Sequence, residues 1–131
     1  MSITYVEIND IQYPATISGR MKDKDWDERE SKTIHFETIM TYEEAKNLFV
    51  DNASWNIVQE SEEMVETFDE EGNLIVNENG EPVLKVEIVK DVFDNSDFCI
   101  AGPITDNRDG TIDVKMGKFT NEELLLMEVL A

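Results

Sequence analysis

Residues 6–17, "VEINDIQYPATI", set the architecture that we expect for the whole chain. Apolar-rich segments flank the pair Asn9-Asp10, and both residue types tolerate the positive φ angles of a two-residue hairpin turn. The stretch therefore predicts two antiparallel strands, near residues 3–8 and 11–18.

Similar turn signals recur three times in the second half of the chain. Each begins with Asp or Asn and has Gly at its fourth position, as in a type I turn followed by a glycine in the left-handed region. They are Asp69-Glu70-Glu71-Gly72, Asn77-Glu78-Asn79-Gly80 and Asn107-Arg108-Asp109-Gly110. The second turn is expected to pair "NLIVNE" with "PVLKVEIVK", and the third to pair residues near 97–106 with "TIDVKMG".

Alternation of apolar and polar residues shows which faces of these strands are apolar. In "TIDVKMG", one face carries Ile112, Val114 and Met116. In "PVLKVEIVK", one face carries Leu84, Val86 and Ile88.

Two further segments read as strands. "KTIHFETI", residues 32–39, alternates apolar and polar side chains as a half-buried strand does, and "SWNIVQE", residues 54–60, is expected to form another. The mixed-charge stretch at residues 21–32 predicts a loop around Trp26.

Helix signals are confined to two short segments. Thr41-Tyr42-Glu43-Glu44 matches the capping box, in which a threonine side chain and a glutamate three residues later bind free backbone amides, and it predicts a helix near residues 42–50. Thr120-Asn121-Glu122-Glu123 is a second capping box and opens "EELLLMEVLA", which predicts a C-terminal helix of about ten residues.

These patterns together predict a mainly β (α+β) fold. We expect an antiparallel meander of roughly seven to nine strands that forms a small barrel or sandwich, with one short internal helix and a C-terminal helix. The β-rich domain is expected to span residues 1–118 and the final helix residues 119–131. A chain of 131 residues can bury one core of this kind without disulfide bonds. Accordingly, Cys99, the one cysteine, is expected to be a small buried residue.

Composition excludes several classes of function. The chain has 30 acidic and 11 basic residues and a formal net charge of −19, so no basic stripe is available to bind a nucleic-acid backbone directly. No apolar run approaches the roughly 18 residues that cross a bilayer, and the first residues lack the pattern of a secretory signal. We therefore expect a soluble protein that does not act at a membrane.

Metal binding was weighed at two acidic segments. In "TDNRDGTIDVKMG", counting from Asp106, glycine falls fifth instead of sixth and the twelfth position is Gly117, which has no side-chain ligand. Asp23, Asp25 and Asp27 have the alternate spacing of a calcium loop but lack its glycine and its final glutamate. Neither segment is an EF-hand. Two interpretations of Asp23, Asp25 and Asp27 stay open: a looser carboxylate site, or a solvated loop with salt bridges.

Catalytic signatures are missing from the sequence. The single histidine, His35, falls on a predicted strand and is interpreted as a polar residue of its outer face. We find no nucleophile elbow, no metal-binding His pair and no phosphate-binding glycine loop. The prediction is a protein without enzymatic activity, with no catalytic, cofactor or metal site to assign.

Two segments suggest protein partners instead. Residues 60–81 carry nine acidic residues and no Lys or Arg. This composition is typical of a nucleic-acid mimic, or of a hairpin whose solvent-facing acidic residues keep it soluble. The final helix is apolar around much of its circumference, so it is expected either to pack across an open sheet face or to dock on another chain. Its candidate partner-binding residues are Leu124, Leu125, Leu126, Met127, Val129 and Leu130.

A resemblance adds a context. "CIAGPITDNRDGT" and "VKMGK", between Cys99 and Lys118, precede a Thr-capped acidic helix, and this ending resembles small uncharacterised proteins of bacteriophage and prophage tail regions from Gram-positive hosts. "YVEINDIQYPATISGR" and "DWDERESKTI" are similar to the same group, whereas residues 60–95 have no counterpart. The family has no catalytic motif to carry over.

The resemblance implies a tail-associated structural or assembly protein. Such a protein would be made in the bacterial host cytoplasm, with the virion as a further location, and would bind other phage proteins or itself through the final helix. The alternative is an acidic nucleic-acid mimic that inhibits a host DNA-binding protein or nuclease.

Overall fold

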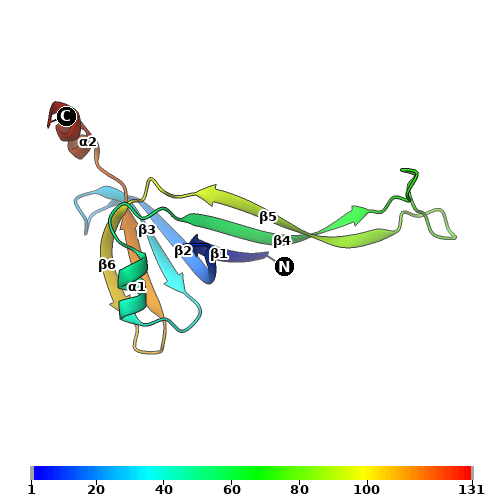
Figure 1. The fold of residues 1–131 in the computed structure, drawn as a ribbon, viewed down its shortest axis with the longest axis horizontal. Coiled ribbons are helices and arrows are strands. Elements are labelled where there is room, and N and C mark those ends of the chain that lie inside the picture. The colour runs from blue at the N-terminus through cyan, green and yellow to red at the C-terminus, as the bar shows by residue number, and fades with distance from the viewer. Residues whose placement is uncertain (1, 131) are drawn as a thin grey trace.

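Seven antiparallel strands form a single sheet in the computed structural model, which describes residues 2–130 (Figure 1). The strands are β1 (Ser2–Ile8), β2 (Ile11–Asp23), β3 (Arg29–Phe36), β4 (Asn56–Glu66), β5 (Leu84–Asp94), β6 (Ile100–Asp106) and β7 (Ile112–Gly117). The helices are α1 (Tyr42–Leu48) and α2 (Asn121–Leu130). The mainly β fold with two short helices is thereby confirmed.

The strand order is β5-β4-β1-β2-β3-β7-β6, which departs from a meander. After β3, the chain passes through α1 and returns to the free side of β1, where β4 pairs with it. After β5, the chain moves to the opposite edge, where β6 pairs with β7. Over residues 2–130 the sheet has open edges at β5 and β6 and is not closed into a barrel.

The first hairpin is confirmed, but its second strand is longer than expected. Asn9 and Asp10 have φ angles of 53° and 64°, as a type I′ turn requires. β2 then continues through residues predicted to form a loop and pairs with β3 up to Asp23 opposite Arg29. The loop predicted around Trp26 is confirmed at residues 24–28, but it is shorter than the expected 21–32. The strands extend into the predicted loop because the charged residues at their ends, Asp23 and Arg29, are buried.

The core lies between α1 and one face of the sheet. α1 begins at Thr41, whose hydroxyl accepts a hydrogen bond from the Glu44 amide at 3.1 Å, and it buries Ala45. Aromatic side chains fill the space behind it, and the Trp55 indole N–H donates to the Phe98 carbonyl at 3.0 Å. The fully or almost fully buried apolar residues include Val6, Ile8, Ala15, Ile34, Phe36, Met40, Phe49, Ile112, Val114 and Met116.

The β6–β7 hairpin matches its prediction, with Ile112, Val114 and Met116 all buried on one face. Its turn does not match, because Arg108 has a φ angle of 62° in addition to the positive φ of Gly110. The carboxylates of Asp106 and Asp109 accept hydrogen bonds from backbone amides inside the turn and fix this different shape. Just before β6, Cys99 is half-buried, so it is less buried than predicted.

β5 pairs differently from the prediction. Its ladder partner is β4, in an unbroken register from Asn56 opposite Asp94 to Glu66 opposite Leu84. The expected partner, residues 73–78, contributes only the isolated bridge between Val76 and Pro82 and neighbouring backbone bonds. β5 pairs with β4 because β4 offers eleven residues of pairing, whereas residues 73–78 offer almost none.

Candidate interaction surfaces

β4 and β5 continue past the end of β1 and project from the body of the molecule. The last pair between β1 and β4 among the described residues is Ser2 opposite Ser61, and from Glu62 onward the described partner of β4 is β5. We name residues 62–88 the arm; Figure 1 shows it extending far beyond the other strands. A two-stranded extension has little packing of its own, so the arm is a candidate interaction surface.

The tip of the arm is built from two copies of one turn. The Asp69 carboxylate accepts hydrogen bonds from the Glu71 and Asn73 amides at 3.0 and 2.9 Å. The Asn77 side chain does the same for the Asn79 and Glu81 amides at 2.9 and 3.0 Å.

Glycine completes each of these turns. Gly72 and Gly80 have φ angles of 87° and 78°, and the amide of each donates to the carbonyl of the first turn residue. These two turns confirm the predicted geometry and hold the acidic tip in a defined shape.

The arm has one apolar and one polar face. Paired residues in an antiparallel ladder point to the same side, so the register places Met64 beside Val86 and Glu62 beside Ile88. The opposite side carries Glu63 beside Glu87. We name the first side the apolar arm face, and its large apolar residues are Met64, Leu84, Val86 and Ile88. Two carboxylates of β4, Glu62 and Glu66, border these residues on the same side.

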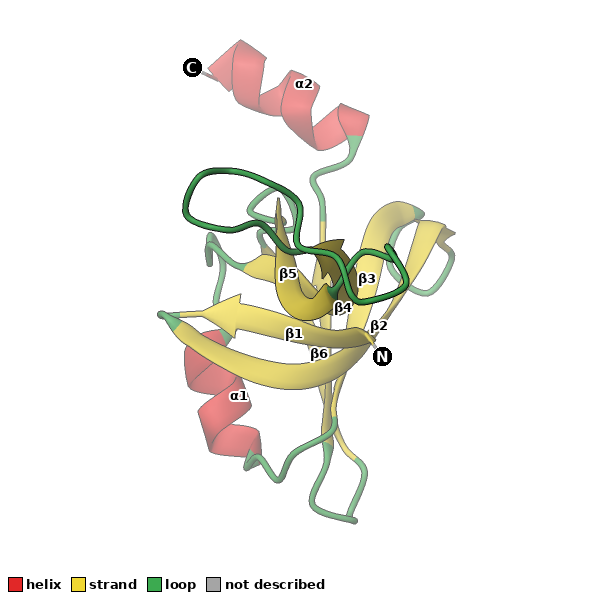
Figure 2. Cartoon of the chain, turned by 90° about the vertical axis from the view of Figure 1, so that its right-hand side faces the viewer, coloured by secondary structure: helices red, strands yellow, loops and turns green. Residues whose placement is uncertain are grey.

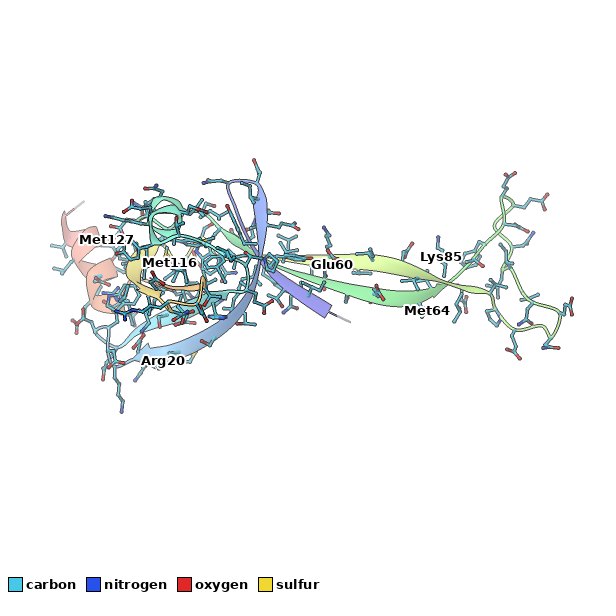
Figure 3. All side chains as sticks on the ribbon, turned by 90° about the horizontal axis from the view of Figure 1, so that it is seen from below. Arg20, Glu60, Met64, Lys85, Met116 and Met127 are labelled. Atoms are coloured by element: carbon cyan, nitrogen blue, oxygen red, sulfur yellow. The ribbon has the colours of Figure 1, made fainter. Side chains whose placement is uncertain are left out.

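The apolar arm face is open to solvent in the described chain. The side chains of Met64 and Ile88 are both 61% exposed, and Val86 is 56% exposed. Figure 3 shows Met64 and Lys85 on the arm, with Glu60 nearer to the body. Single exposed apolar residues are ordinary, but a contiguous strip on a projecting element is a candidate binding surface.

α2 is joined to the body by a completed capping box and a two-pronged ion pair. The Glu123 amide donates to the Thr120 hydroxyl at 3.2 Å, and the Thr120 amide donates to the Glu123 carboxylate at 2.8 Å. Arg29 donates to both oxygens of the same carboxylate, at 2.8 and 3.2 Å. The hydrogen bonds from Arg29 and then from Thr120 lower the pKa of Glu123 to about 2.

Trp26 holds the Arg29 end of this contact. The guanidinium carbon of Arg29 lies 5.0 Å from the centre of the Trp26 ring. The same ring lies directly over Gly102 and Gly117, where any added Cβ atom would approach it to within 2.7 Å. Arg29 is therefore only 6% exposed and is fixed before it meets α2.

Asp23 is a buried acceptor and not an exposed ligand. Its carboxylate accepts hydrogen bonds at 2.8 Å from the Lys115 ammonium and the Ser31 hydroxyl, and these contacts lower its pKa to about 2. Asp25 and Asp27 are exposed on the turn between β2 and β3. Across residues 2–130, no three His, Cys, Asp or Glu side chains converge as a cation site would require.

α2 does not cover the sheet. Figure 2 shows it apart from the strands and away from α1. Its candidate partner-binding residues are exposed: Leu124 (47%), Leu125 (61%), Leu126 (60%), Met127 (49%) and Val129 (79%). The side chain of Leu130 lies outside the described part of the structure. Packing across an open sheet face, one of the two expectations for this helix, is therefore not what the chain does.

An open groove separates α2 from the turn between β2 and β3. Its walls include Met21, Lys22 and Lys118 from the body and Glu122, Leu124 and Leu126 from the helix. The groove keeps one side of α2 accessible as well as its outer side.

His35 lies on the outer face of β3, as expected. Its Nδ1 atom is 2.5 Å from the carboxylate of Asp113, the residue opposite it on β7. Both side chains are partly exposed, and the pair links two strands on a solvated surface. This arrangement is the ordinary cross-strand contact of a sheet.

The arm is the candidate interaction surface that the sequence did not predict. The sequence identifies the acidic segment 60–81. It predicts, however, that the strand with Leu84, Val86 and Ile88 pairs with residues 73–78 and not with β4. A signal was present in "QESEEMVE", residues 59–66, where successive acidic residues leave no face that could lie on a core. A strand of that composition has to leave the body, and the strand paired with it has to leave too.

No protein-family model, curated protein or solved structure matches the chain. Within residues 2–130, neither helix has the length and apolar character needed to cross a bilayer.

Proposed function

We propose that this chain is a non-enzymatic structural or assembly protein of a bacteriophage or prophage tail, and that it binds its partners through the arm and α2. The observation that carries the proposal is the apolar arm face, an uncovered strip of large side chains on a projecting hairpin. Burying such a strip yields roughly 25 cal/mol per Å² of apolar surface, which favours association strongly.

α2 supports the proposal independently. Glu123 fastens the first turn of the helix to Arg29, while the apolar residues beyond it stay in solvent. A helix that is held at its base and uncovered along its length is suited to lie in the groove of another protein. The partners are other phage proteins or further copies of this chain.

The phage context comes from the resemblance of residues 99–118 and of the first hairpin to tail-region proteins. With residues 25–34, these segments form β1, β2, β3, β6 and β7, so the resemblance covers the body and not the arm. The open sheet also fits an assembly role. A larger sheet would form when a partner strand joins an open edge.

A second candidate function rests on the acidic tip. The carboxylates between Glu62 and Glu81 are exposed, and no basic residue lies among them, so this end of the molecule could enter the basic cleft of a nuclease. The apolar arm face favours the assembly role, because a phosphate mimic needs charge and gains nothing from exposed Met64 and Val86.

Deletion of the gene from the phage or prophage that encodes it tests the assembly role. We expect particles without normal tails in negative-stain electron micrographs, and normal tails when the wild-type gene is supplied from a plasmid. A variant with Leu125→Ser and Leu126→Ser tests α2, with Glu122→Gln as the matched control on the same helix. Normal infectious particles from the deletion strain would refute the proposal.

The mimic is tested on a nuclease with a basic cleft. Inhibition that is strong at low salt and falls steeply as salt rises would support it. The expected result is no inhibition at either low or physiological salt.

A further inference from the structure

The two open edges of the sheet differ in how well they resist pairing with another strand. β6 has seven residues, contains Pro103, and its ladder with β7 is broken by a bulge between Ala101 and Ile104. Proline and bulges are common devices that stop an edge from accepting a further strand. β5 has eleven residues, no proline and an unbroken register. β5 is thus the edge left free to pair.

We propose that β5 pairs antiparallel with the β5 of a second copy of this chain, about a two-fold axis at Ile88. This inference builds on the proposed assembly function, because it names the first partner of the arm. In this register Leu84 of each copy lies opposite Val92 of the other, so nine residues of each strand are paired.

Charge complementarity along β5 supports this register. Lys85 of each copy faces Asp91 of the other, which forms two ion pairs on the polar face of the joined arms. Glu87 faces the uncharged Val89. Lys85 is weakly bound within its own chain, where its ammonium lies 3.9 Å from the exposed carboxylate of Glu87.

Neighbouring registers are less favourable. If the two-fold axis lay between two residues, the apolar arm face of one copy would lie beside the polar face of the other. A shift that centres the axis on Glu87 sets this carboxylate against itself. Centring it on Val89 sets Glu87 against Asp91. The register about Ile88 avoids all three conflicts.

The proposed pairing also suits the apolar arm face and the acidic tips. It joins two strips of Met64, Leu84, Val86 and Ile88 through Ile88, which lies next to its own copy. Lys90 of each copy lies beside Val86 of the other and keeps its ion pair with Glu60 at 3.4 Å. Because the strands are antiparallel, the tip of each arm points toward the Asn95 end of its partner's β5. The two acidic tips therefore lie far apart, which limits repulsion between chains of net charge −19.

A single cysteine at the axis tests the register. The native thiol is removed by Cys99→Ser, and Ile88→Cys is introduced in that background. Directly opposed residues in antiparallel strands have Cα atoms about 4.5–5.5 Å apart, within disulfide range. Mild oxidation is expected to convert most of this variant to a covalent dimer.

Val86→Cys in the same background is the matched control. In the proposed register this residue and its copy are four positions apart along the strand, or about 13 Å, so it should cross-link far more slowly. Equal cross-linking of both variants, or none of Ile88→Cys, would overturn the register.

Charge exchange tests the pairing without covalent chemistry. Lys85→Glu or Asp91→Lys alone should weaken dimerisation about tenfold in sedimentation equilibrium, and the double variant should restore it. Glu87→Lys, opposite Val89, should have little effect.

A protein that stays monomeric at about 100 μM, with native circular dichroism, would refute the β5 dimer. The proposed tail function would survive that result if gene deletion still abolished tails, so the two failures are distinguishable.

Discussion

Arg29 and Glu123 lie 94 residues apart in the sequence and form the contact that holds α2 to the sheet. The guanidinium donates to both carboxylate oxygens, and one of its N–H groups also donates to the Lys118 carbonyl at 2.9 Å. Arg29 is fixed by Trp26, so the position of the helix is set from the body and not from within the helix.

Weakening this contact should free α2 without unfolding the sheet. In Glu123→Gln the charge is lost and only one oxygen remains to accept a hydrogen bond, so amide exchange in residues 121–130 should become faster. Hydrogen–deuterium exchange with mass spectrometry measures this. The control is Glu122→Gln, an exposed neighbour, which should exchange like the wild type. Equal exchange in both variants would show that Arg29 does not hold the helix.

Acid should weaken the buried Asp23 contact in a defined pH range. The pKa of Asp23 falls from 3.8 to about 2 in the folded protein, mainly through its hydrogen bond from Lys115. A lowered carboxyl pKa contributes stability that is present above about pH 3.8 and is lost as pH falls toward about 2.

Asp23→Asn isolates this contribution from the general effect of acid on an acidic chain. We expect the variant to be less stable than the wild type in urea at pH 7, because Lys115 loses its partner. The difference should shrink as pH falls from 3.8 to about 2. A gap that stays constant over this range would contradict the role of Asp23.

Gly117 should not tolerate a methyl group. Its added Cβ would lie 2.7 Å from the Trp26 ring and 2.8 Å from the Arg29 Cδ atom. Gly117→Ala should therefore cost about 1–3 kcal/mol and shift the tryptophan fluorescence as Trp26 is displaced. At Gly19, the nearest atom would be 3.7 Å away, so Gly19→Ala is the control and should be close to neutral. Equal stability of the two variants in urea would show that Trp26 does not pack as described.

Substitutions of two valines on adjoining strands distinguish a residue that packs in the core from one that is free to bind a partner. Val58 on β4 is fully buried, and Val58→Ala should cost roughly 1.5–3 kcal/mol in the free energy of unfolding. Val86 on β5 is 56% exposed, and Val86→Ala should change it by no more than about 0.5 kcal/mol. Chemical denaturation at low protein concentration measures both. A large loss in Val86→Ala would mean that the arm packs on the body.

Local signals predicted the local elements correctly. The Asn9-Asp10 hairpin, the Thr41 N-cap, the capping box at Thr120 and the alternation of Ile112 through Met116 each depend on residues close together in sequence. At Thr41 only the hydroxyl half of the predicted box is present. Their physical causes, turn angles, amide capping and one apolar face, are all visible in a short stretch.

Long-range features could not be predicted in this way. The extension of β2 depends on the burial of Asp23 beneath Lys115, and the position of α2 depends on Arg29, and neither partner is indicated by spacing. The arm was missed for a related reason. Leu84, Val86 and Ile88 were correctly placed on one face, but a period of two does not tell whether that face meets a core, solvent or another chain.

The central claim is that the apolar arm face serves tail assembly, and complementation of the deletion strain tests it most directly. The rescuing gene carries Val86→Ser and Ile88→Ser, and Glu63→Gln on the opposite arm face is the matched control. We predict that the double variant folds, as judged by circular dichroism, but fails to restore tails, whereas the control restores them. Normal tails and full infectious titre from the double variant would contradict the account.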